Sequence, residues 1–334
     1  MAKANTDKLE NAWPTRPADA LISVIVPCYN EELVIHETHK RLTETLDDNG
    51  LTFELIYVND GSSDRTLDLL REIAAEDDRV RYLALSRNFG HQLAVTAGLD
   101  VTEGDAIVVI DADLQDPPAV IAEMFREWRL GSDVVYGQRK TREGESAFKL
   151  MTAKMFYRAL NGISDIEIPM DVGDFRLMDK EVAQLMADMR ERDRYLRGMV
   201  AWLGFKQTAL PYKRDARYAG ETKYPLKKMM GLAFNGMMSF SMAPLRFVLG
   251  LGMVVVALAT IGVIYAVALR LLTDNWVSGW TLLFIAVMMM GGVHLIVMGA
   301  IGEYVGRIYM QSKGRPLYAV RERHGFDQSA RGER

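Results

Sequence analysis

Residues 106–118 read AIVVIDADLQDPP, an apolar run followed directly by three aspartates and a glutamine. The five apolar residues predict a strand that is buried on both faces, as in a parallel sheet. The acidic side chains begin where this strand is expected to end, and the paired prolines predict the start of a helix. The stretch therefore indicates a buried strand whose carboxyl end carries a cluster of carboxylates.

The same alternation of apolar runs and amphipathic stretches fills the first 140 residues. Expected strands cover residues 21–27, 53–60, 80–86, 106–113 and 133–137. Expected helices cover residues 31–48, 63–76, 91–101 and 117–130. This order predicts an α/β domain with a mostly parallel sheet that helices cover on both faces. Ligands bind such sheets at the carboxyl ends of the strands, which here carry PCYNEE, NDGSSD, SRNFGH, DADLQD and GQRK.

The composition argues against several classes of protein. A formal net charge of −4 over 334 residues argues against a general nucleic-acid binder, which needs a basic surface. The single cysteine, Cys28, excludes an intrachain disulfide and a cysteine-rich zinc site, and it fits a reducing compartment. Residues 1–20 have no apolar stretch of the kind that a secretory signal needs, so we expect a polar N-terminal lead.

Two apolar stretches near the C-terminus predict transmembrane helices at about residues 247–269 and 279–301. At about 1.5 Å per residue, each can cross a hydrocarbon core of about 30 Å. The short connection between them predicts a hairpin, so both flanks lie on one side, and their basic residues place that side in the cytoplasm. The alternative, two buried helices of a soluble domain, is disfavoured because neither stretch has a polar stripe.

Residues 225–243 predict an amphipathic helix that lies in the membrane interface, with an ordinary core-facing helix as the alternative. The expected organisation is then a lead at 1–20, a cytoplasmic catalytic domain at 21–224, the interfacial helix, two transmembrane helices within 244–302, and a cytoplasmic segment at 303–334. The whole is expected in the inner (cytoplasmic) membrane with both termini in the cytoplasm.

The strand ends lack the common phosphate-binding loops. No GxGxxG follows the first strand, and no Walker A pattern is present. A site that binds a diphosphate through carboxylates needs a metal between them, and Mg²⁺ or Mn²⁺ prefers such oxygen ligands. For an isolated DxD, a turn with an Asx cap is the alternative.

The motifs of the chain, taken in order, resemble glycosyltransferase family 2, with its GT-A fold. They are SVIVPCYNEE, VNDGSSD, SRNFGH, DADLQDPP, GQR, DVGDFRLMDK and YKRDARYAGETKY. With the hairpin and IGEYVGRIYMQSKGRPLY, the chain is similar to bacterial polyisoprenyl-phosphate glycosyltransferases, bactoprenol glucosyltransferases among them, and to dolichyl-phosphate mannose synthase.

This resemblance implies roles for particular residues. The implied metal ligands are Asp111, Asp113 and Gln115. The implied catalytic residues are Asp111, Asp113 and Asp174. The implied nucleotide-sugar site comprises Pro27, Tyr29, Asn30, Glu31, Asp60, Asp111, Ala112, Asp113, Arg194 and Arg197.

The acceptor in the resembled family is a lipid phosphate, for which basic residues after the nucleotide half are candidates. They are Arg139, Lys149, Thr152, Arg214, Arg217 and Lys223. Relatives carry an arginine and a hydroxyl-bearing residue four positions apart after GQR, and Lys149 with Thr152 depart from that pattern. A phosphate with a second pKa near ~6 is already an ionised nucleophile, so Asp174 is expected to orient the acceptor or the sugar rather than to act as a strong base.

The resemblance implies an inverting transferase that moves a hexose from a nucleotide-sugar, UDP-glucose first, to undecaprenyl phosphate. It also implies a homotetramer, a flippase for the product and a downstream transferase for the cell envelope, and no nucleic acid partner. Two alternatives remain open: a processive polysaccharide synthase, and a membrane-anchored nucleotide-sugar sensor without turnover.

Overall fold

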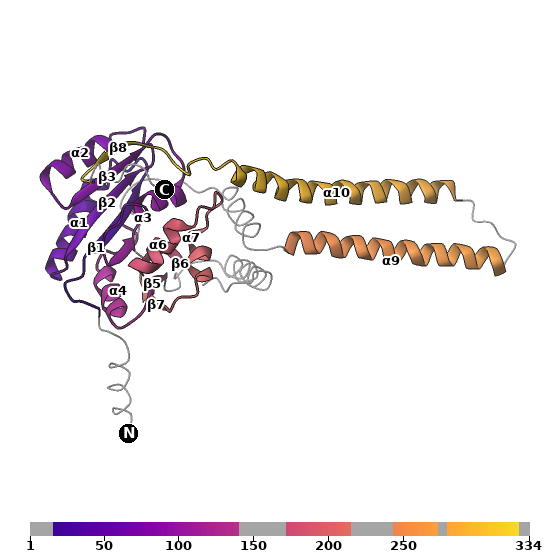
Figure 1. The fold of residues 1–334 in the computed structure, drawn as a ribbon, viewed down its shortest axis with the longest axis horizontal. Helices are drawn as coiled ribbons and strands as arrows, with labels where there is room; N and C mark the ends of the chain where they lie inside the picture. Colours follow the sequence, from indigo (N-terminus) through magenta and orange to yellow (C-terminus); the bar gives the residue numbers. More distant parts are fainter. Residues whose placement is uncertain (1–15, 140–171, 215–242, 273–278, 327–334) are drawn as a thin grey trace, which may run out of the picture.

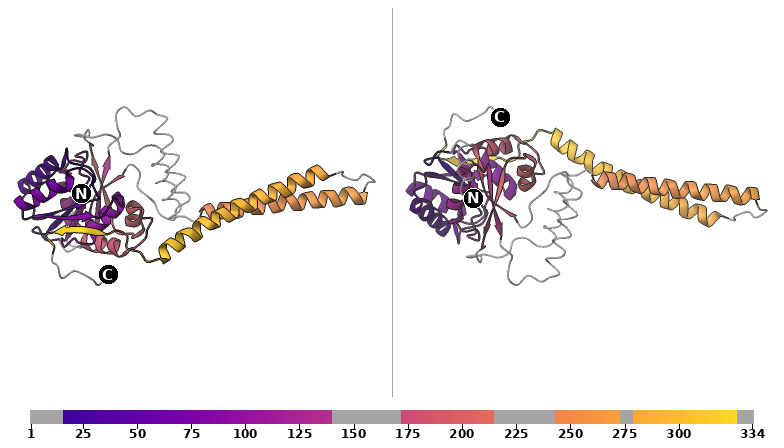
Figure 2. Two further views of the ribbon diagram at one scale, coloured as in Figure 1. Left: turned by 90° about the horizontal axis from the view of Figure 1, so that it is seen from above. Right: turned by 90° about the horizontal axis from the view of Figure 1, so that it is seen from below.

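A computed structural model describes residues 16–139, 172–214, 243–272 and 279–326. It consists of an α/β domain from which two long helices project side by side (Figures 1 and 2). Several predictions lie outside the described residues: the interfacial helix and the candidate phosphate ligands Lys149, Thr152, Arg217 and Lys223.

The domain is built on one eight-stranded sheet with the order β7-β5-β6-β4-β1-β2-β3-β8. The strands are β1 (Ile22–Cys28), β2 (Phe53–Asn59), β3 (Val80–Leu85), β4 (Ala106–Val109), β5 (Val134–Arg139), β6 (Val172–Asp179), β7 (Gln207–Tyr212) and β8 (Val320–His324). The central strands β4, β1, β2 and β3 are parallel, as predicted. The sheet is nevertheless mixed, because β6 runs antiparallel to β4 and β5, and β8 runs antiparallel to β3.

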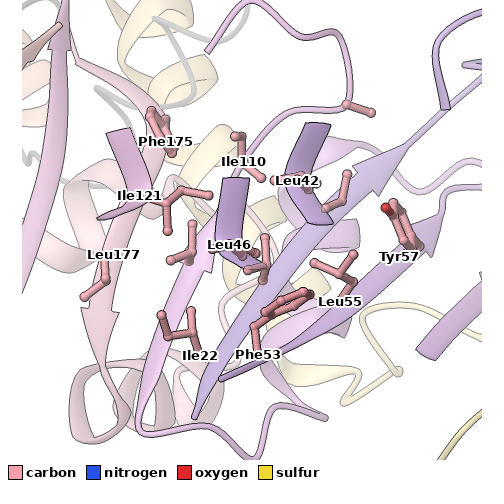
Figure 3. Close-up of a cluster of buried hydrophobic side chains, with 14 of the residues drawn as sticks. Ile22, Leu42, Leu46, Phe53, Leu55, Tyr57, Ile110, Ile121, Phe175 and Leu177 are labelled. Atoms are coloured by element: carbon pink, nitrogen blue, oxygen red, sulfur yellow. The ribbon is translucent and has the colours of Figure 1, made fainter. Parts of the chain in front are cut away.

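Helices cover both faces of the sheet. Among the described residues, the helices of the domain are α1 (Ile35–Asp48), α2 (Thr66–Glu76), α3 (His91–Leu99), α4 (Val120–Arg129), α6 (Lys180–Asp188) and α7 (Leu196–Trp202). Those of one face, α1, α2 and α4, pack on a core that includes Leu55 (Figure 3) and Val24. Those of the other face, α3, α6 and α7, pack on Ile25 and Ile56. Successive residues of a strand thus pack into cores on opposite faces of the sheet, which explains why the sequences of these strands are continuous apolar runs.

Three of the four expected helices, α1, α2 and α4, begin later than predicted, whereas α3 begins at His91 as predicted. The expected helix at 31–48 begins at Ile35, because residues 31–34 form a turn in which the Glu31 carbonyl accepts bonds from the amides of Val34 and Ile35, each 3.0 Å long. The expected helix at 117–130 begins at Val120, after the two prolines. The polar turns at the strand ends are therefore longer, which leaves more backbone at the edge where ligands bind.

The C-terminal segment returns to the sheet of the α/β domain. As strand β8 it pairs with β3, whose edge would otherwise expose unpaired backbone groups. Glu322 of β8 accepts hydrogen bonds from Arg71 Nε at 2.9 Å and from the Tyr82 hydroxyl at 2.7 Å. The N-terminal lead is also anchored in part, since Arg16 pairs with Asp133 at 2.8 Å.

The attachment of β8 is expected to depend on pH. The hydrogen bonds from Arg71 and then Tyr82 lower the pKa of Glu322 to about 2, so its stabilisation is complete above the unfolded pKa of 4.5 and is lost as pH falls toward 2. At pH 7 we expect Glu322→Gln to raise hydrogen exchange in β8 by about five-fold, equivalent to about 1 kcal/mol for this partly exposed pair. The difference from the wild type should shrink toward pH 2, whereas Glu44→Gln, on an exposed face of α1, should match the wild type throughout. Equal β8 exchange in wild type and Glu322→Gln at pH 7 would contradict this role.

The projecting helices are α9 (Ala243–Leu272) and α10 (Trp280–Ser312), each longer than the predicted span. Among the described residues one segment, Met289–Ser312, is by length and composition apolar enough to cross a membrane, and it lies further along the chain than the predicted 279–301. The end of α10 contacts the domain, where Gln311 accepts a bond from the Arg192 amide at 3.2 Å and donates one to the Arg190 carbonyl at 2.9 Å. Arg307 pairs with Asp193 at 2.8 Å.

Candidate active site

The DADLQDPP motif forms a loop beyond the end of β4. The predicted strand at 106–113 is too long, since β4 ends at Val109 and the chain turns at Leu114, which has a φ of 58°. Thr38 of α1 donates a hydrogen bond of 2.7 Å to the Ala112 carbonyl, and the Gln115 amide donates one of 3.1 Å to Asp113 Oδ1. The loop is thus held at the carboxyl edge of the sheet by its neighbour helix and by its own backbone.

Asp111 and Asp174 meet at this edge on either side of His91. The His91 Nε2 atom lies 3.2 Å from Asp174 Oδ2 and 3.7 Å from Asp111 Oδ1. The three residues come from the start of α3, from the loop after β4, and from β6, the antiparallel neighbour of β4. The antiparallel pairing brings Asp174 here, because the beginning of β6 lies beside the end of β4.

Three further side chains surround the Asp174 carboxylate, whose side chain is 10% exposed. Arg197 Nε of α7 donates to Oδ1 at 2.9 Å, and Gln92 Nε2 donates to Oδ2 at 3.2 Å. Arg176 Nη2 lies 3.9 Å from Oδ1. Gln92 also accepts a bond of 2.9 Å from the Leu196 amide, so the same side chain joins Asp174 to the start of α7.

The cluster separates the pKa values of its two aspartates. Burial would raise the pKa of Asp174, but Arg197, His91 and Arg176 together hold it well below its ordinary value. For Asp111, burial raises the pKa, the charge of His91 lowers it, and the charges of Asp116, Asp174 and Asp113 raise it further, so that it reaches about 6. Burial lowers the pKa of His91, but Asp111 and Asp174 outweigh it and raise that pKa to about 9. Asp174 is therefore a fixed anion between cations.

The loops after β1 and β2 form the neighbouring part of the edge. Asp60 is buried and accepts bonds from the amides of Phe89 at 2.7 Å and Gly90 at 2.9 Å. Burial raises its pKa, and these amides partly offset that rise. Asn30, with a φ of 54°, accepts a bond of 2.8 Å from the Ser63 amide, and the Glu31 amide donates one of 2.9 Å to Thr66. The two loops are thus tied to each other.

Pro27 and Tyr29 belong to the same β1 end, where the Tyr29 side chain is among the exposed large hydrophobic residues. Of the predicted nucleotide-sugar residues, those after β1, β2 and β4 follow neighbouring parallel strands of the sheet, and Arg197 reaches Asp174. The groups that follow β1, β2 and β4 share one edge of the sheet, because these neighbouring strands are parallel.

Arg194 is different, and its assignment to the nucleotide-sugar site is not supported by the structure. Its guanidinium is buried and donates to the carbonyls of Met189 and Met186, the latter at 2.7 Å, at the end of α6. Helix ends leave carbonyls without intrahelical partners, and an arginine satisfies them well. Arg194 therefore holds α6 to α7, one turn before Arg197.

Comparisons with known proteins identify the family of this chain. Residues 23–185 match the profile described as glycosyl transferase family 2. The chain is 50% identical to the uncharacterized glycosyltransferase YkcC of Bacillus subtilis, over 91% of this chain and 94% of that protein. The chain belongs to glycosyl transferase family 2.

Other relatives of this glycosyltransferase have more specific names. It is 38% identical to the prophage bactoprenol glucosyl transferase homolog of Escherichia coli K12, over 90% of this chain and 98% of that protein. Among solved structures, glucosyl-3-phosphoglycerate synthase from Mycobacterium tuberculosis aligns with a TM-score of 0.45 and 23% identity, over 70% of this chain and 82% of that chain. That structural likeness is too distant to inform the chemistry.

The loop of this glycosyltransferase has a donor set that suits a hard divalent cation. Within the described ranges no three His, Cys, Asp or Glu side chains form a ready metal site. Asp111, Asp113 and the amide oxygen of Gln115 nevertheless offer hard oxygens, and burial followed by the charges of neighbouring carboxylates raises the pKa of Asp111, a cost that a cation would relieve. A bound diphosphate would supply further oxygens to the same ion.

The sequence did not single out three residues of the Asp174 cluster: His91, Gln92 and Arg176. A signal for His91 was present, because the SRNFGH motif ends at the first residue of α3. Arg176 lies two residues after Asp174 on β6, but it donates to the Gly173 carbonyl at 3.1 Å, a contact that depends on the turn of the backbone. No spacing in the sequence predicts that Gln92 spans Asp174 and α7.

Proposed function

We propose that this glycosyltransferase moves a hexose from a nucleotide-sugar, UDP-glucose first, to a polyisoprenyl phosphate at the cytoplasmic face of the membrane. The observation that carries the proposal is the position of Asp174. It lies beside Asp111 of the carboxylate loop through His91, and its neighbour Gly173 lies against Arg139. Candidate groups for binding the donor and for binding the acceptor thus lie on either side of the Asp174 carboxylate. The relatives named bactoprenol glucosyl transferase support the acceptor class.

The reaction breaks the bond between the anomeric carbon and the nucleoside diphosphate and forms a bond from that carbon to an oxygen of the acceptor phosphate. When bound at Asp111, Asp113 and Gln115, Mg²⁺ or Mn²⁺ supplies the charge that stabilises the departing diphosphate. The Pro27–Glu31 and Asp60 loops bind the nucleoside, and Arg197 holds Asp174 in place. The ionised Asp174 orients the reactants and stabilises positive charge that develops on the sugar.

The acceptor phosphate needs no strong base, because it is already largely ionised near neutral pH. Attack from the face opposite the diphosphate inverts the anomeric configuration. The basic side chains Arg139 and Arg214 bind the phosphate, together with candidates outside the described residues. Positioning both reactants then supplies much of the acceleration.

The membrane assignment is part of the same proposal. A polyisoprenyl tail stays in the bilayer, so α9 and α10 form a two-span hairpin that holds the domain at the headgroups, with both termini in the cytoplasm. The contacts of Gln311 and Arg307 with residues 190–193 support a fixed orientation of the domain on α10. A homotetramer, a product flippase and a downstream transferase complete the proposed setting.

The test is transfer itself. Purified protein is incubated with undecaprenyl phosphate, Mg²⁺ or Mn²⁺, and a panel of radiolabelled nucleotide-sugars, and label is counted in the lipid phase. We expect label from one donor above all others, with UDP-glucose first. Label that enters a polymer instead of a lipid with one sugar would favour a processive synthase. Binding of a nucleotide-sugar without any transfer would overturn the enzyme proposal in favour of a sensor.

A further inference from the structure

Asp116, the last acid of the DADLQDPP loop, belongs to a buried polar cluster with Tyr212 and Arg214. This cluster lies next to Arg139, a candidate ligand of the acceptor phosphate. The Asp116 side chain is 1% exposed and accepts a hydrogen bond from the hydroxyl of Tyr212, on β7. Arg214, two residues further along, places its Nε atom 3.4 Å from the same Asp116 oxygen. Asp116 thus does more than precede α4, since its carboxylate faces β7, on the far side of β5 from the strand that carries Asp174.

Arg139 completes this cluster from β5. Its position pairs with Tyr212 in the parallel β5–β7 ladder, and its guanidinium is close enough to lower the pKa of the Tyr212 hydroxyl, against the larger effects of burial and Asp116 that raise it. The other end of the guanidinium lies against Gly173, where a methyl group in place of the glycine hydrogen would come within 2.8 Å of Nη2. Arg139 therefore lies between Tyr212 and the residue that precedes Asp174.

The hydrogen bonds of this cluster are incomplete among the described residues. The buried atoms without a hydrogen-bond partner there include Asp116 Oδ2, Arg139 Nε and Arg214 Nε. Among the described residues, Arg214 pairs with Asp116 and Arg139 lies near Tyr212, so two guanidinium groups share this cluster with the Asp116 carboxylate, and a buried charge without a partner is costly. A phosphate group would balance the charge and accept bonds from planar guanidinium donors.

We propose that Asp116 and Tyr212 form a positioning pair that aims Arg139 and Arg214 at the acceptor phosphate and joins this anion site to the carboxylate loop of the donor site. Asp116 is one residue after Gln115, so a shift of the donor loop moves the pair, and through it the arginines. Both are positioning residues, since neither touches the reacting atoms. The inference rests on the proposed function for the identity of the acceptor.

The pair is tested with Tyr212→Phe, which removes the hydroxyl and keeps the ring that packs edge-on against Phe175 at 5.7 Å. Asp116→Asn keeps the volume and removes the charge. The matched control is Tyr318→Phe, which loses a hydroxyl that donates to Asp100 at 2.5 Å elsewhere in the domain. The probe is farnesyl phosphate, whose dissociation constant is measured by calorimetry in detergent, alongside the KM values for both substrates.

We expect both variants to bind farnesyl phosphate about tenfold more weakly and to raise the KM for lipid phosphate by a similar factor, which corresponds to one lost hydrogen bond to a charged group. The KM for the nucleotide-sugar should change by less than about twofold in Tyr212→Phe, and this unchanged value also shows that the variant is folded. Tyr318→Phe should match the wild type in all three measurements.

The outcomes separate the two proposals. Farnesyl phosphate binding that is unchanged in both variants overturns the positioning pair but leaves the proposed function standing. Binding that weakens as expected in a protein that transfers no sugar overturns the proposed function and supports the pair. No binding of farnesyl phosphate by the wild type overturns the anion site, and with it the pair. An equal loss of affinity for both substrates also overturns the pair, because it indicates general damage.

Discussion

Asp174→Asn is expected to lower kcat for sugar transfer by about 100-fold or more, with the smaller change in KM. The carboxylate is held ionised by Arg197, His91 and Arg176, and a neutral amide of the same size cannot stabilise positive charge on the sugar. It also leaves the cations around it without their shared anion, so Arg197 is expected to move. Transfer of labelled sugar to undecaprenyl phosphate under saturating donor measures the effect.

The matched control is Asp47→Asn, since Asp47 also pairs with an arginine, Arg79 at 2.8 Å, but on the exposed surface of α1. It should keep wild-type kcat. A thermal unfolding scan of both variants separates loss of catalysis from loss of fold. If Asp174→Asn keeps full kcat while its Tm falls, the cluster has a structural role only, and the assignment of Asp174 as a catalytic residue is wrong.

Asp113→Ala is expected to reduce kcat/KM by about 1000-fold, because removal of one charged ligand from a small oxygen set forfeits several kcal/mol of charge stabilisation on the leaving diphosphate. Addition of EDTA to the wild type should produce the same loss, and Mg²⁺ or Mn²⁺ should restore it. The variant should also bind Mn²⁺ more weakly, as the electron paramagnetic resonance signal of the free ion reports directly.

Asp78→Ala serves as the control, because Asp78 is an exposed aspartate that follows α2. It should leave both activity and Mn²⁺ binding unchanged. Full transfer by Asp113→Ala in the presence of EDTA would show that the loop does not use a metal, and the carboxylates after β4 would then need another explanation.

The central strands could be predicted from sequence because each is buried on both faces and so reads as an unbroken apolar run. Three strands were missed, β6, β7 and β8, and two of them, β6 and β8, lack this simplicity. β6 reads VGDFRLMD, with the Asp174 and Arg176 side chains turned toward the candidate site, and β8 reads VRERH, an exposed edge strand. Polar residues in these strands are explained by ion pairs with Arg197 and Arg71, and such partners are distant in the sequence.

The candidate site likewise has a part that the sequence predicts and a part that it does not. Chain order alone placed the groups after β1, β2 and β4 at one edge, because the carboxyl ends of parallel strands share that edge whatever the details of packing. Local order could not distinguish Arg194 from Arg197. Both lie near the start of α7, yet one satisfies the carbonyls at the end of α6 and the other binds Asp174.

The amino-acid sequence was sufficient for the positions of the central strands along the chain, their parallel arrangement, the family and the carboxylate loop, because these depend on periodic burial and on residues that are close along the chain. Only the tertiary structure brought His91, Gln92 and Arg197 around Asp174, set Asp116 against Tyr212, and returned β8 to the edge of the sheet. Those arrangements depend on which charges lose water together when distant segments pack, and each buried charge then requires a partner that chain order does not specify.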